Sequence, residues 1–182
     1  MSTDKSIVTI HMVSSLDFFI ESEDGSTDWL ETEDLYEGGV SGDETEEDIG
    51  SIGCFVLGSR TYELALKLGW PYGDVPTIVL TRRDLTSERD SVSFYSGDLK
   101  QLVDDRLRPQ YGSIWMVGGA MLARDFIRAD LADEIRISIM PIILGGGTPF
   151  FEKIGQQRPL HLRDVTAYRN GIVALCYDIR KP

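Results

Sequence analysis

The sequence predicts an α/β fold with a mostly parallel central sheet, helices on both of its faces and an antiparallel hairpin at the C-terminal end. Short apolar runs rich in β-branched residues alternate along the chain with segments of helical spacing, which is the order typical of parallel sheets. Asn170-Gly171 then separates the last two strand-like runs and is a strong signal for a hairpin turn.

The expected elements follow one another in a regular order. A first strand over residues 7–13 leads into a long polar excursion over residues 26–48, in which an apolar cluster of Trp29, Leu30, Leu35 and Tyr36 is expected to form a short helix on the body. Further strands are expected over residues 53–57, 77–80, 91–95, 113–117 and 134–144, and the hairpin strands over 160–168 and 172–179. Helices are expected over residues 61–68, over 99–107 with Asp98 as N-cap, and over 120–128.

Length and composition favour one globular domain over residues 1–182. A chain of 182 residues can bury a large core without disulfides or metals, and 42% hydrophobic with 26% charged residues is an ordinary globular composition. No apolar run approaches the length of a membrane span, and the first residues lack the basic and apolar regions of a signal peptide. A cytoplasmic protein with no membrane partner is therefore expected.

The net charge of −12 comes from one segment. Of the 30 acidic residues, 13 fall within residues 21–48, which contain no Lys or Arg, and the remaining 17 are balanced by 18 basic residues. The rest of the chain lacks the clustered Lys and Arg of a nucleic-acid surface, so no nucleic-acid partner is expected. The acidic segment is interpreted as a solvated loop, with a functional acidic lid as the alternative.

Three turns that follow predicted strands are candidates for phosphate binding. Ligands of open α/β sheets bind at the carboxyl ends of the strands, where helix N-termini offer free N–H groups to phosphates. One turn has two glycines that let the backbone approach a pyrophosphate, the second combines hydroxyls with a cation, and the third carries two guanidinium groups suited to a 2′-phosphate. A single turn of this kind is more often a tight turn that binds nothing, and it is the occurrence of three such turns after three strands that favours phosphate binding. The candidate residues are Val117, Gly118, Gly119 and Ala120, then Gly58, Ser59, Arg60 and Thr61, and finally Thr81, Arg82 and Arg83.

The sequence lacks the motifs that are typical of other enzyme classes. The sequence contains no GxSxG, GxxxxGK[ST] or HExxH pattern, and no metal site is expected. His11 lies in an apolar run and is interpreted as a core or pocket-wall residue, while residues 145–147 are interpreted as a flexible glycine turn. Cys54 and Cys176 lie in separate strand-like runs without a CxxC partner, so both are expected to be buried, inert thiols.

Several motifs resemble one known family. The run Val117-Gly118-Gly119-Ala120, followed by LADEIRISIMPIILGGGTPFFE over residues 131–152, resembles the C-terminal reductase domain of the bifunctional riboflavin-biosynthesis deaminase/reductase, a member of the dihydrofolate reductase-like superfamily. Further points of resemblance are Ser15-Leu16-Asp17, Asp28-Trp29 and GSRTYE over residues 58–63. The resemblance implies a three-layer α/β/α dihydrofolate reductase-like fold with NADPH across the carboxyl ends of the strands, on the three turns described above.

Two features depart from that family. Phe18 follows Asp17 where the family usually has glycine, and no deaminase domain with zinc-binding His and Cys precedes the reductase-like part. Both departures argue against riboflavin synthesis itself. They favour the small reductase-like relatives of the family.

The resemblance also suggests where the proton for the reaction comes from. Dihydrofolate reductases place an acid a few residues after a tryptophan, and here Asp34 follows Trp29 by five positions. Asp17, at the end of the first strand, is the competing candidate. A carboxyl group in a partly apolar pocket has a raised pKa and can deliver a proton near neutral pH.

The sequence thus predicts an NADPH-dependent oxidoreductase that transfers a hydride to a C=N or C=O bond of a small heterocycle, of pteridine or aminopyrimidine type. The alternative is a non-catalytic nucleotide-binding homodimer that keeps the fold. Under either hypothesis a homodimer is expected, formed through the antiparallel end of the sheet, where the run 134–144 and the hairpin leave apolar strand edge.

Overall fold

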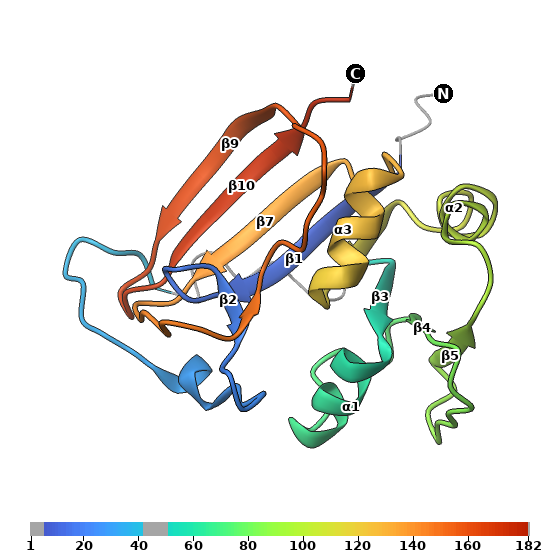
Figure 1. Cartoon of the computed structure of the whole chain (residues 1–182), viewed down its shortest axis with the longest axis horizontal. Coiled ribbons are helices and arrows are strands. Elements are labelled where there is room, and N and C mark those ends of the chain that lie inside the picture. The colour runs from blue at the N-terminus through green and yellow to red at the C-terminus, as the bar shows by residue number, and fades with distance from the viewer. Residues whose placement is uncertain (1–5, 42–50, 182) are drawn as a thin grey trace.

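The computed structural model describes residues 6–41 and 51–181. Its main element is an eight-stranded sheet of order β5-β4-β3-β6-β1-β7-β10-β9 (Figure 1). A separate pair, β2 (Phe19–Glu21) and β8 (Thr148–Pro149), forms a small second sheet. The strands of the main sheet are β1 (Ile7–Ser14), β3 (Cys54–Gly58), β4 (Thr77–Leu80), β5 (Val92–Tyr95), β6 (Ser113–Met116), β7 (Glu134–Ile139), β9 (Leu160–Ala167) and β10 (Val173–Ile179).

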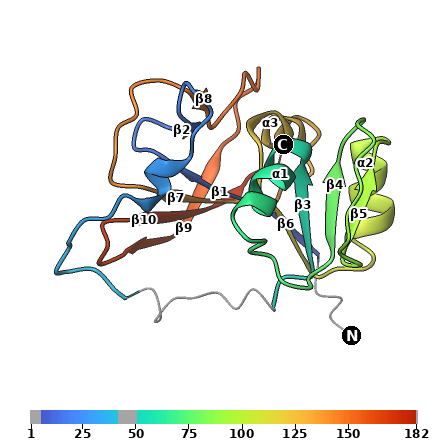
Figure 2. The same cartoon turned by 90° about the horizontal axis from the view of Figure 1, so that it is seen from below.

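The strand directions confirm the predicted mixed sheet. The strands from β5 to β7 are mutually parallel, whereas β10 runs antiparallel to β7 and β9 runs antiparallel to β10. Gly171 in the hairpin turn has a φ of +82°, a conformation that glycine adopts without strain. The β9–β10 hairpin forms one end of the sheet, and β4 with β5 forms the other (Figures 1 and 2).

Helices cover the two faces of the sheet unequally. Alternate residues of β3 point to opposite faces, and Cys54 and Val56 join a core cluster with α3 (Ala120–Arg128), whereas Phe55 and Leu57 pack with α1 (Ser59–Lys67). The predicted helix over 99–107 is α2 (Leu99–Gln101) continued by the π-helical η4 (Leu102–Leu107), and its apolar side chains join the α3 cluster. No helix in the described part of the chain is long and apolar enough to cross a membrane.

The strand expected over residues 134–144 is shorter than predicted. It ends at Ile139, because Pro141 has no N–H to donate and Ile142 N turns back to donate to Met140 O at 2.8 Å. An apolar run therefore continues past the point where the hydrogen-bond ladder stops. This correction places residues 140–147 in a loop at the carboxyl edge of the sheet.

The acidic excursion forms less helix than expected. A single 3-10 turn, η1 (Asp28–Glu31), buries Trp29, whereas Leu35 and Tyr36 are exposed and not helical. Tyr36 N instead donates to Arg169 O at 2.8 Å, so this stretch runs along the hairpin end of the sheet. The excursion predicted over 26–48 continues into residues 42–50, which lie outside the described residues.

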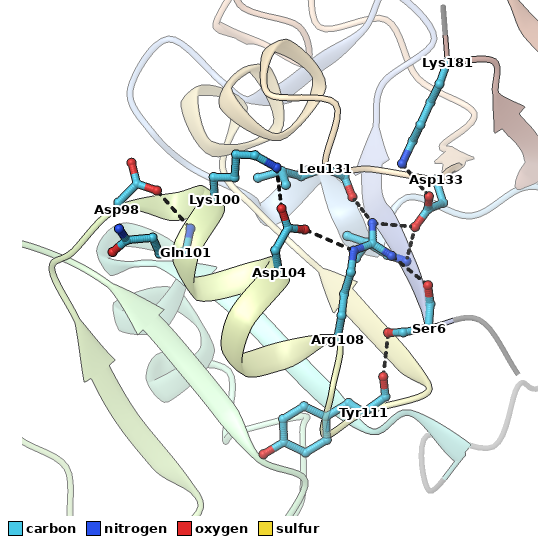
Figure 3. A network of polar contacts seen from close by, with 11 residues as sticks. Ser6, Asp98, Lys100, Gln101, Asp104, Arg108, Tyr111, Leu131, Asp133 and Lys181 are labelled. Atoms are coloured by element: carbon cyan, nitrogen blue, oxygen red, sulfur yellow. Dashed lines mark hydrogen bonds and ion pairs between the residues drawn. The ribbon is translucent and has the colours of Figure 1, made fainter. Parts of the chain in front are cut away.

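A polar network ties the start of the chain to its end (Figure 3). Arg108 donates from Nη1 to Ser6 O at 2.7 Å and from Nη2 to Asp133 Oδ2 at 2.9 Å. Asp133 Oδ2 also accepts Val8 N at 3.0 Å, and its Oδ1 accepts Lys181 Nζ at 2.8 Å. Burial would raise the pKa of Asp133, but the bonds from Lys181 and Val8 and the charge of Arg108 hold it below its usual value.

Candidate functional site

The turns after β3 and β6 are joined directly. Because β3 and β6 are parallel neighbours, both turns emerge at the carboxyl edge of the sheet. Gly58 N donates to Gly118 O at 2.9 Å, which fixes the first turn against the second. Two of the three predicted phosphate-binding turns therefore form one continuous backbone surface.

The two glycines of the second turn have different roles. Gly118 has a φ of +142°, and a Cβ there would lie 2.8 Å from Thr61 Oγ1 of the first turn, so this position is closed to side chains by the protein itself. A Cβ on Gly119 would meet no atom closer than Thr61 Oγ1 at 3.9 Å. The peptide between the two glycines is cis. Gly119 thus leaves open space on the surface where a ligand could approach.

Both helices that follow these turns begin without a side-chain cap. Gly58 is the N-cap of α1 and Gly119 the N-cap of α3, and neither supplies a side-chain oxygen to the first N–H groups. Such groups carry the positive end of the helix dipole and are suited to phosphate oxygens. The backbone of this surface therefore fits a pyrophosphate group.

The third turn brings cations to the same edge. Leu80 at the end of β4 is in register with Gly58, so Thr81, Arg82 and Arg83 continue beside the first turn. The hydroxyl of Thr81 accepts the N–H of Arg83 at 3.0 Å. Within the described residues no ion pair joins Arg60 or Arg82 to a carboxylate, whereas Arg83 Nη2 pairs with Glu63 Oε1 of α1 at 2.6 Å.

A pocket of about 520 Å³ opens on the α1 side of the sheet beside these turns. Val117, which leads into the glycine pair, is also part of the pocket wall. Aromatic rings from Phe55, Tyr72 and Trp115 line it, and the polar side chains come from the strands on the hairpin side. These are His11, Arg136, Ser138, Asp164, Thr166 and Cys176.

His11 lies on the wall of this pocket, as expected from its place in an apolar strand. Its ring stacks on Trp115 with centroids 4.5 Å apart, and the guanidinium of Arg136 lies 5.7 Å from the Trp115 ring. Burial, aided by the nearby charge of Arg136, lowers the pKa of His11 to about 4. His11 is therefore a neutral imidazole at physiological pH, able to donate or accept one hydrogen bond.

Asp17 lies just beyond β1, and its side chain is hydrogen-bonded to the backbone of the glycine turn at residues 145–147. Its carboxylate accepts the hydroxyl of Ser15 at 2.6 Å and the backbone N–H groups of Leu144 and Gly145 at 3.0 and 2.7 Å. The bond from Ser15 and those from the backbone lower the pKa of Asp17. Phe18, which stands where the resembling family has glycine, keeps a positive φ of +62°, so the turn retains a backbone shape that glycine favours.

Trp29 and Asp34 lie on the excursion between β2 and β3. Trp29 is buried, and its Nε1 has no hydrogen-bond partner among the described residues. Asp34 is exposed and lies against the hairpin turn, where its N–H donates to Asn170 O at 3.0 Å. Neither residue, nor Asp17, lines the pocket described above.

The two thiols differ in exposure. Cys54 is fully buried, as expected, and burial raises its pKa to about 12. Cys176 is only partly buried, which corrects the expectation, because β10 has no helix over the face that carries it and its side chain reaches the pocket. Burial still raises the pKa of Cys176, so both remain thiols at neutral pH.

Sequence reasoning missed two features of the candidate site, the pairing of Glu63 with Arg83 and the pocket. Glu63 stood within the GSRTYE motif, but its pairing with Arg83 depends on how β3 and β4 align and has no local signal. The pocket combines residues from β1, β3, β6, β7, β9 and β10. The one available signal was the unusual polar residues within apolar strand runs, such as His11 and Arg136.

Comparison with known proteins gives consistent matches. Residues 56–174 match the protein family described as the RibD C-terminal domain. The chain is 32% identical over 167 residues to the uncharacterized protein YwjB of Bacillus subtilis (strain 168), covering 90% of this chain and 92% of YwjB. It is 24% identical over 188 residues to the uncharacterized protein YyaP of the same organism, covering 93% of each chain.

Solved structures share the fold. The "Putative riboflavin biosynthesis protein" from Shewanella sp. PV-4 superposes with a TM-score of 0.80 at 22% identity, covering 96% of this chain and 99% of that chain. The diaminohydroxyphosphoribosylaminopyrimidine deaminase/5-amino-6-(5-phosphoribosylamino)uracil reductase from Thermotoga maritima gives a TM-score of 0.65 at 13% identity, covering 98% of this chain and 58% of that one. The fold expected from the sequence resemblance is thereby confirmed.

Proposed function

Because the chain belongs to the family of the RibD C-terminal domain, we propose that it is an NADPH-dependent reductase of a small heterocycle. The reaction proposed is hydride transfer to a C=N or C=O bond of a pteridine or aminopyrimidine type of substrate. The observation that carries the proposal is the joined surface of the first two turns, made by Gly58 N and Gly118 O at 2.9 Å. It presents two uncapped helix N-termini side by side.

The residues of this surface fit NADPH. The backbone of residues 58–61 and 118–120 would hold the pyrophosphate, since the open side of Gly119 leaves room for it. Arg82 and Arg83 would hold the 2′-phosphate through charge-assisted hydrogen bonds. NADPH, when bound, supplies the hydride.

The aromatic pocket supports a flat heterocyclic substrate. Its wall includes Val117, so the pocket adjoins the cofactor surface directly. Phe55 and Trp115 offer rings for packing against a planar heterocycle, and the neutral His11 offers a hydrogen bond that does not depend on pH near neutrality. The role of these residues is to bind and orient the ring and to exclude water from one of its faces.

The proton that accompanies the hydride is assigned to a carboxyl group. Asp34 and Asp17 are the candidates from the sequence resemblance, while Asp164 lines the pocket and accepts the hydroxyl of Thr166 at 3.1 Å. Asp17 already receives bonds at both oxygens. The three Asp→Asn variants therefore belong in the test, with the pH profile of kcat as the measurement that identifies the donor.

Titration with NADPH, followed by tryptophan fluorescence, tests cofactor binding, and turnover over a panel of pterins and aminopyrimidines tests catalysis. We expect saturable NADPH binding and oxidation of NADPH with at least one substrate. Replacing both Arg82 and Arg83 with Ala is expected to weaken the binding of NADPH by about 1 to 3 kcal/mol and to weaken the binding of NADH far less. Absence of NADPH binding, or equal loss for both cofactors in the double variant, contradicts this assignment.

A second candidate function is a non-catalytic nucleotide-binding homodimer. It is favoured by the state of Asp17, whose hydrogen bonds give it a structural role and a lowered pKa instead of the raised pKa of a proton donor. NADPH binding without turnover on any panel member would support this second candidate.

A further inference from the structure

Glu63 and Arg83 form an ion pair that spans the gap between α1 and the turn after β4. Arg83 Nη2 donates to Glu63 Oε1 at 2.6 Å. The side chains are 42% exposed for Glu63 and 54% exposed for Arg83, so a ligand in solution can reach both. Arg83 belongs to the proposed cofactor site, and in the structure its guanidinium is already paired with a carboxylate of the protein, that of Glu63.

Glu63 is an acid among cations. Arg60 and Lys67 flank it along α1, three residues before and four residues after, where helical neighbours interact. The hydrogen bond from Arg83 is the main cause of its lowered pKa, and the charges of Lys67 and Arg60 act in the same direction. Glu63 therefore carries a full negative charge across the neutral pH range.

We propose that Glu63 is a specificity-determining residue, which competes with the 2′-phosphate of the dinucleotide for Arg83 and so limits the preference for NADPH over NADH. This inference rests on the proposed function, because it requires the adenosine 2′ position to lie at the turn after β4. It goes beyond the proposed reductase activity because it names Glu63 and predicts that this residue lowers the ratio of NADPH to NADH affinity.

The physical reason is the exchange of one anion for another. A 2′-phosphate that binds Arg83 either displaces the carboxylate of Glu63 or shares the guanidinium with it, and in both cases two negative charges lie near each other. NADH carries a 2′-hydroxyl instead, which leaves the Glu63–Arg83 pair intact and can donate a hydrogen bond to the carboxylate, as ribose hydroxyls do to acidic residues in many NAD-binding sites. Glu63 thus disfavours NADPH and favours NADH.

The experiment measures the dissociation constants of NADPH and NADH by tryptophan fluorescence for the wild type, Glu63→Gln, Arg83→Ala and the double variant. Asp130→Asn is the control, since it also removes one negative charge from an ion pair. The Asp130 side chain is 45% exposed and pairs with the mostly buried Arg158 at 2.5 Å, just beyond the far end of α3. We expect Glu63→Gln to raise the ratio of NADPH to NADH affinity by about two- to fivefold, the range for removing one like charge at an exposed site. The control is expected to leave the ratio unchanged, and the gain is expected to shrink at high salt.

The outcomes separate this inference from the proposed function. A wild type that binds neither nucleotide overturns both. A wild type that binds NADPH, together with an unchanged or lowered ratio in Glu63→Gln, overturns the inference alone, because a lowered ratio means that Glu63 orients Arg83 for the phosphate. A raised ratio in Glu63→Gln that Asp130→Asn does not reproduce supports competition at Arg83.

Discussion

Gly58 N donates to Gly118 O at 2.9 Å, and this single bond joins two turns that lie 60 positions apart in the sequence. The bond leaves Thr61 Oγ1 2.8 Å from the position of a Cβ on Gly118. A side chain at Gly118 would therefore disturb the protein, whereas one at Gly119 would project into the space proposed for the cofactor. Substitutions at the two glycines are therefore expected to have different effects, one on stability and the other on cofactor binding.

Gly119→Val is expected to abolish NADPH binding, because its side chain would occupy the space proposed for the pyrophosphate. The protein is expected to stay folded, because a Cβ at this position meets no protein atom closer than Thr61 Oγ1 at 3.9 Å and the φ is −98°. Gly118→Ala is the comparison variant and is expected to lose about 1 to 3 kcal/mol of stability, because its φ of +142° is strained for any side chain. Circular dichroism and thermal unfolding measure the fold, and fluorescence titration measures binding. Unchanged NADPH affinity in Gly119→Val would mean that the turn is only structural.

The pH dependence of stability is expected to depend on His11. Its pKa is about 4 in the folded protein, against 6.5 for the free side chain, so between these values the unfolded chain takes up a proton that the folded protein does not. The contribution of His11 is therefore fully present above pH 6.5 and is lost as the pH falls toward 4. From pH 7.5 to pH 5 the loss amounts to about 2 kcal/mol.

Urea unfolding of the wild type and His11→Gln at pH 7.5 and pH 5 measures this effect, with the exposed His161→Gln as control. The difference in unfolding free energy between wild type and His11→Gln is expected to change by about 2 kcal/mol across this range in favour of the variant at low pH. A difference that stays constant with pH would show that the pKa of His11 is not lowered in the folded protein.

The sequence was sufficient for the parts of the fold that local patterns specify. The strand-turn-helix units at Gly58 and Gly118 and the hairpin turn at Gly171 were found where predicted, and Gly118 and Gly171 have a positive φ that glycine adopts without strain. The end of β7 was missed because apolar composition continues to residue 144, although the ladder stops once Pro141 removes a donor.

The sequence located the candidate site only where it consists of contiguous turns. The turns of the proposed cofactor surface could be identified because each carries its own glycines or arginines. The pairing of Arg83 with Glu63 and the stacking of His11 on Trp115 could not, since the first depends on the alignment of β3 with β4 and the second on that of β1 with β6. The role of Asp17 as a clamp on Leu144 and Gly145 likewise depends on a contact across 127 positions.

Arg108 is expected to be a principal contributor to stability. Its guanidinium satisfies the carbonyls of Ser6 and Leu131 and pairs with the mostly buried Asp133. Arg108→Ala removes a cation and a hydrogen bond from the charged carboxylate of Asp133, so the unfolding free energy is expected to fall by about 2 to 4 kcal/mol. Lys100→Ala is the comparison variant, since it removes only the exposed end of the same network, the ion pair with Asp104, and is expected to change stability by less than about 1 kcal/mol. Chemical denaturation measures both, and equal effects would rule out the network as a stabilising unit.

The last prediction concerns assembly: we expect a homodimer formed through the hairpin end of the sheet. β9 is an edge strand of the sheet, and Leu160, Leu162 and Val165 on it are 43%, 48% and 52% exposed. Their partners on β10 are Ile179, Tyr177 and Leu175, alternate residues of one strand, so the three apolar side chains share one face.

An exposed edge strand with such a face invites pairing, and a two-fold partner would cover both its backbone and its apolar side chains. The alternative is a monomer whose own loop over residues 145–155 covers the edge. Arg128 of α3, however, donates to Lys153 O at 2.6 Å and to Ile154 O at 2.7 Å, which binds this stretch of the loop to α3. The loop is therefore held at α3, and the edge of β9 is left for a second copy.

Light scattering tests the homodimer, which should have twice the 20.4 kDa mass of one chain at micromolar concentrations. Replacing both Leu162 and Val165 with Glu is expected to give the mass of one chain, because four carboxylates would lose their hydration in a two-fold interface built from apolar side chains. Leu66→Glu on α1, an equally exposed apolar position, is the control and should leave the mass unchanged. A wild-type mass of one chain, with and without NADPH, would contradict the homodimer, and a dimer that survives the double substitution would move the interface away from β9.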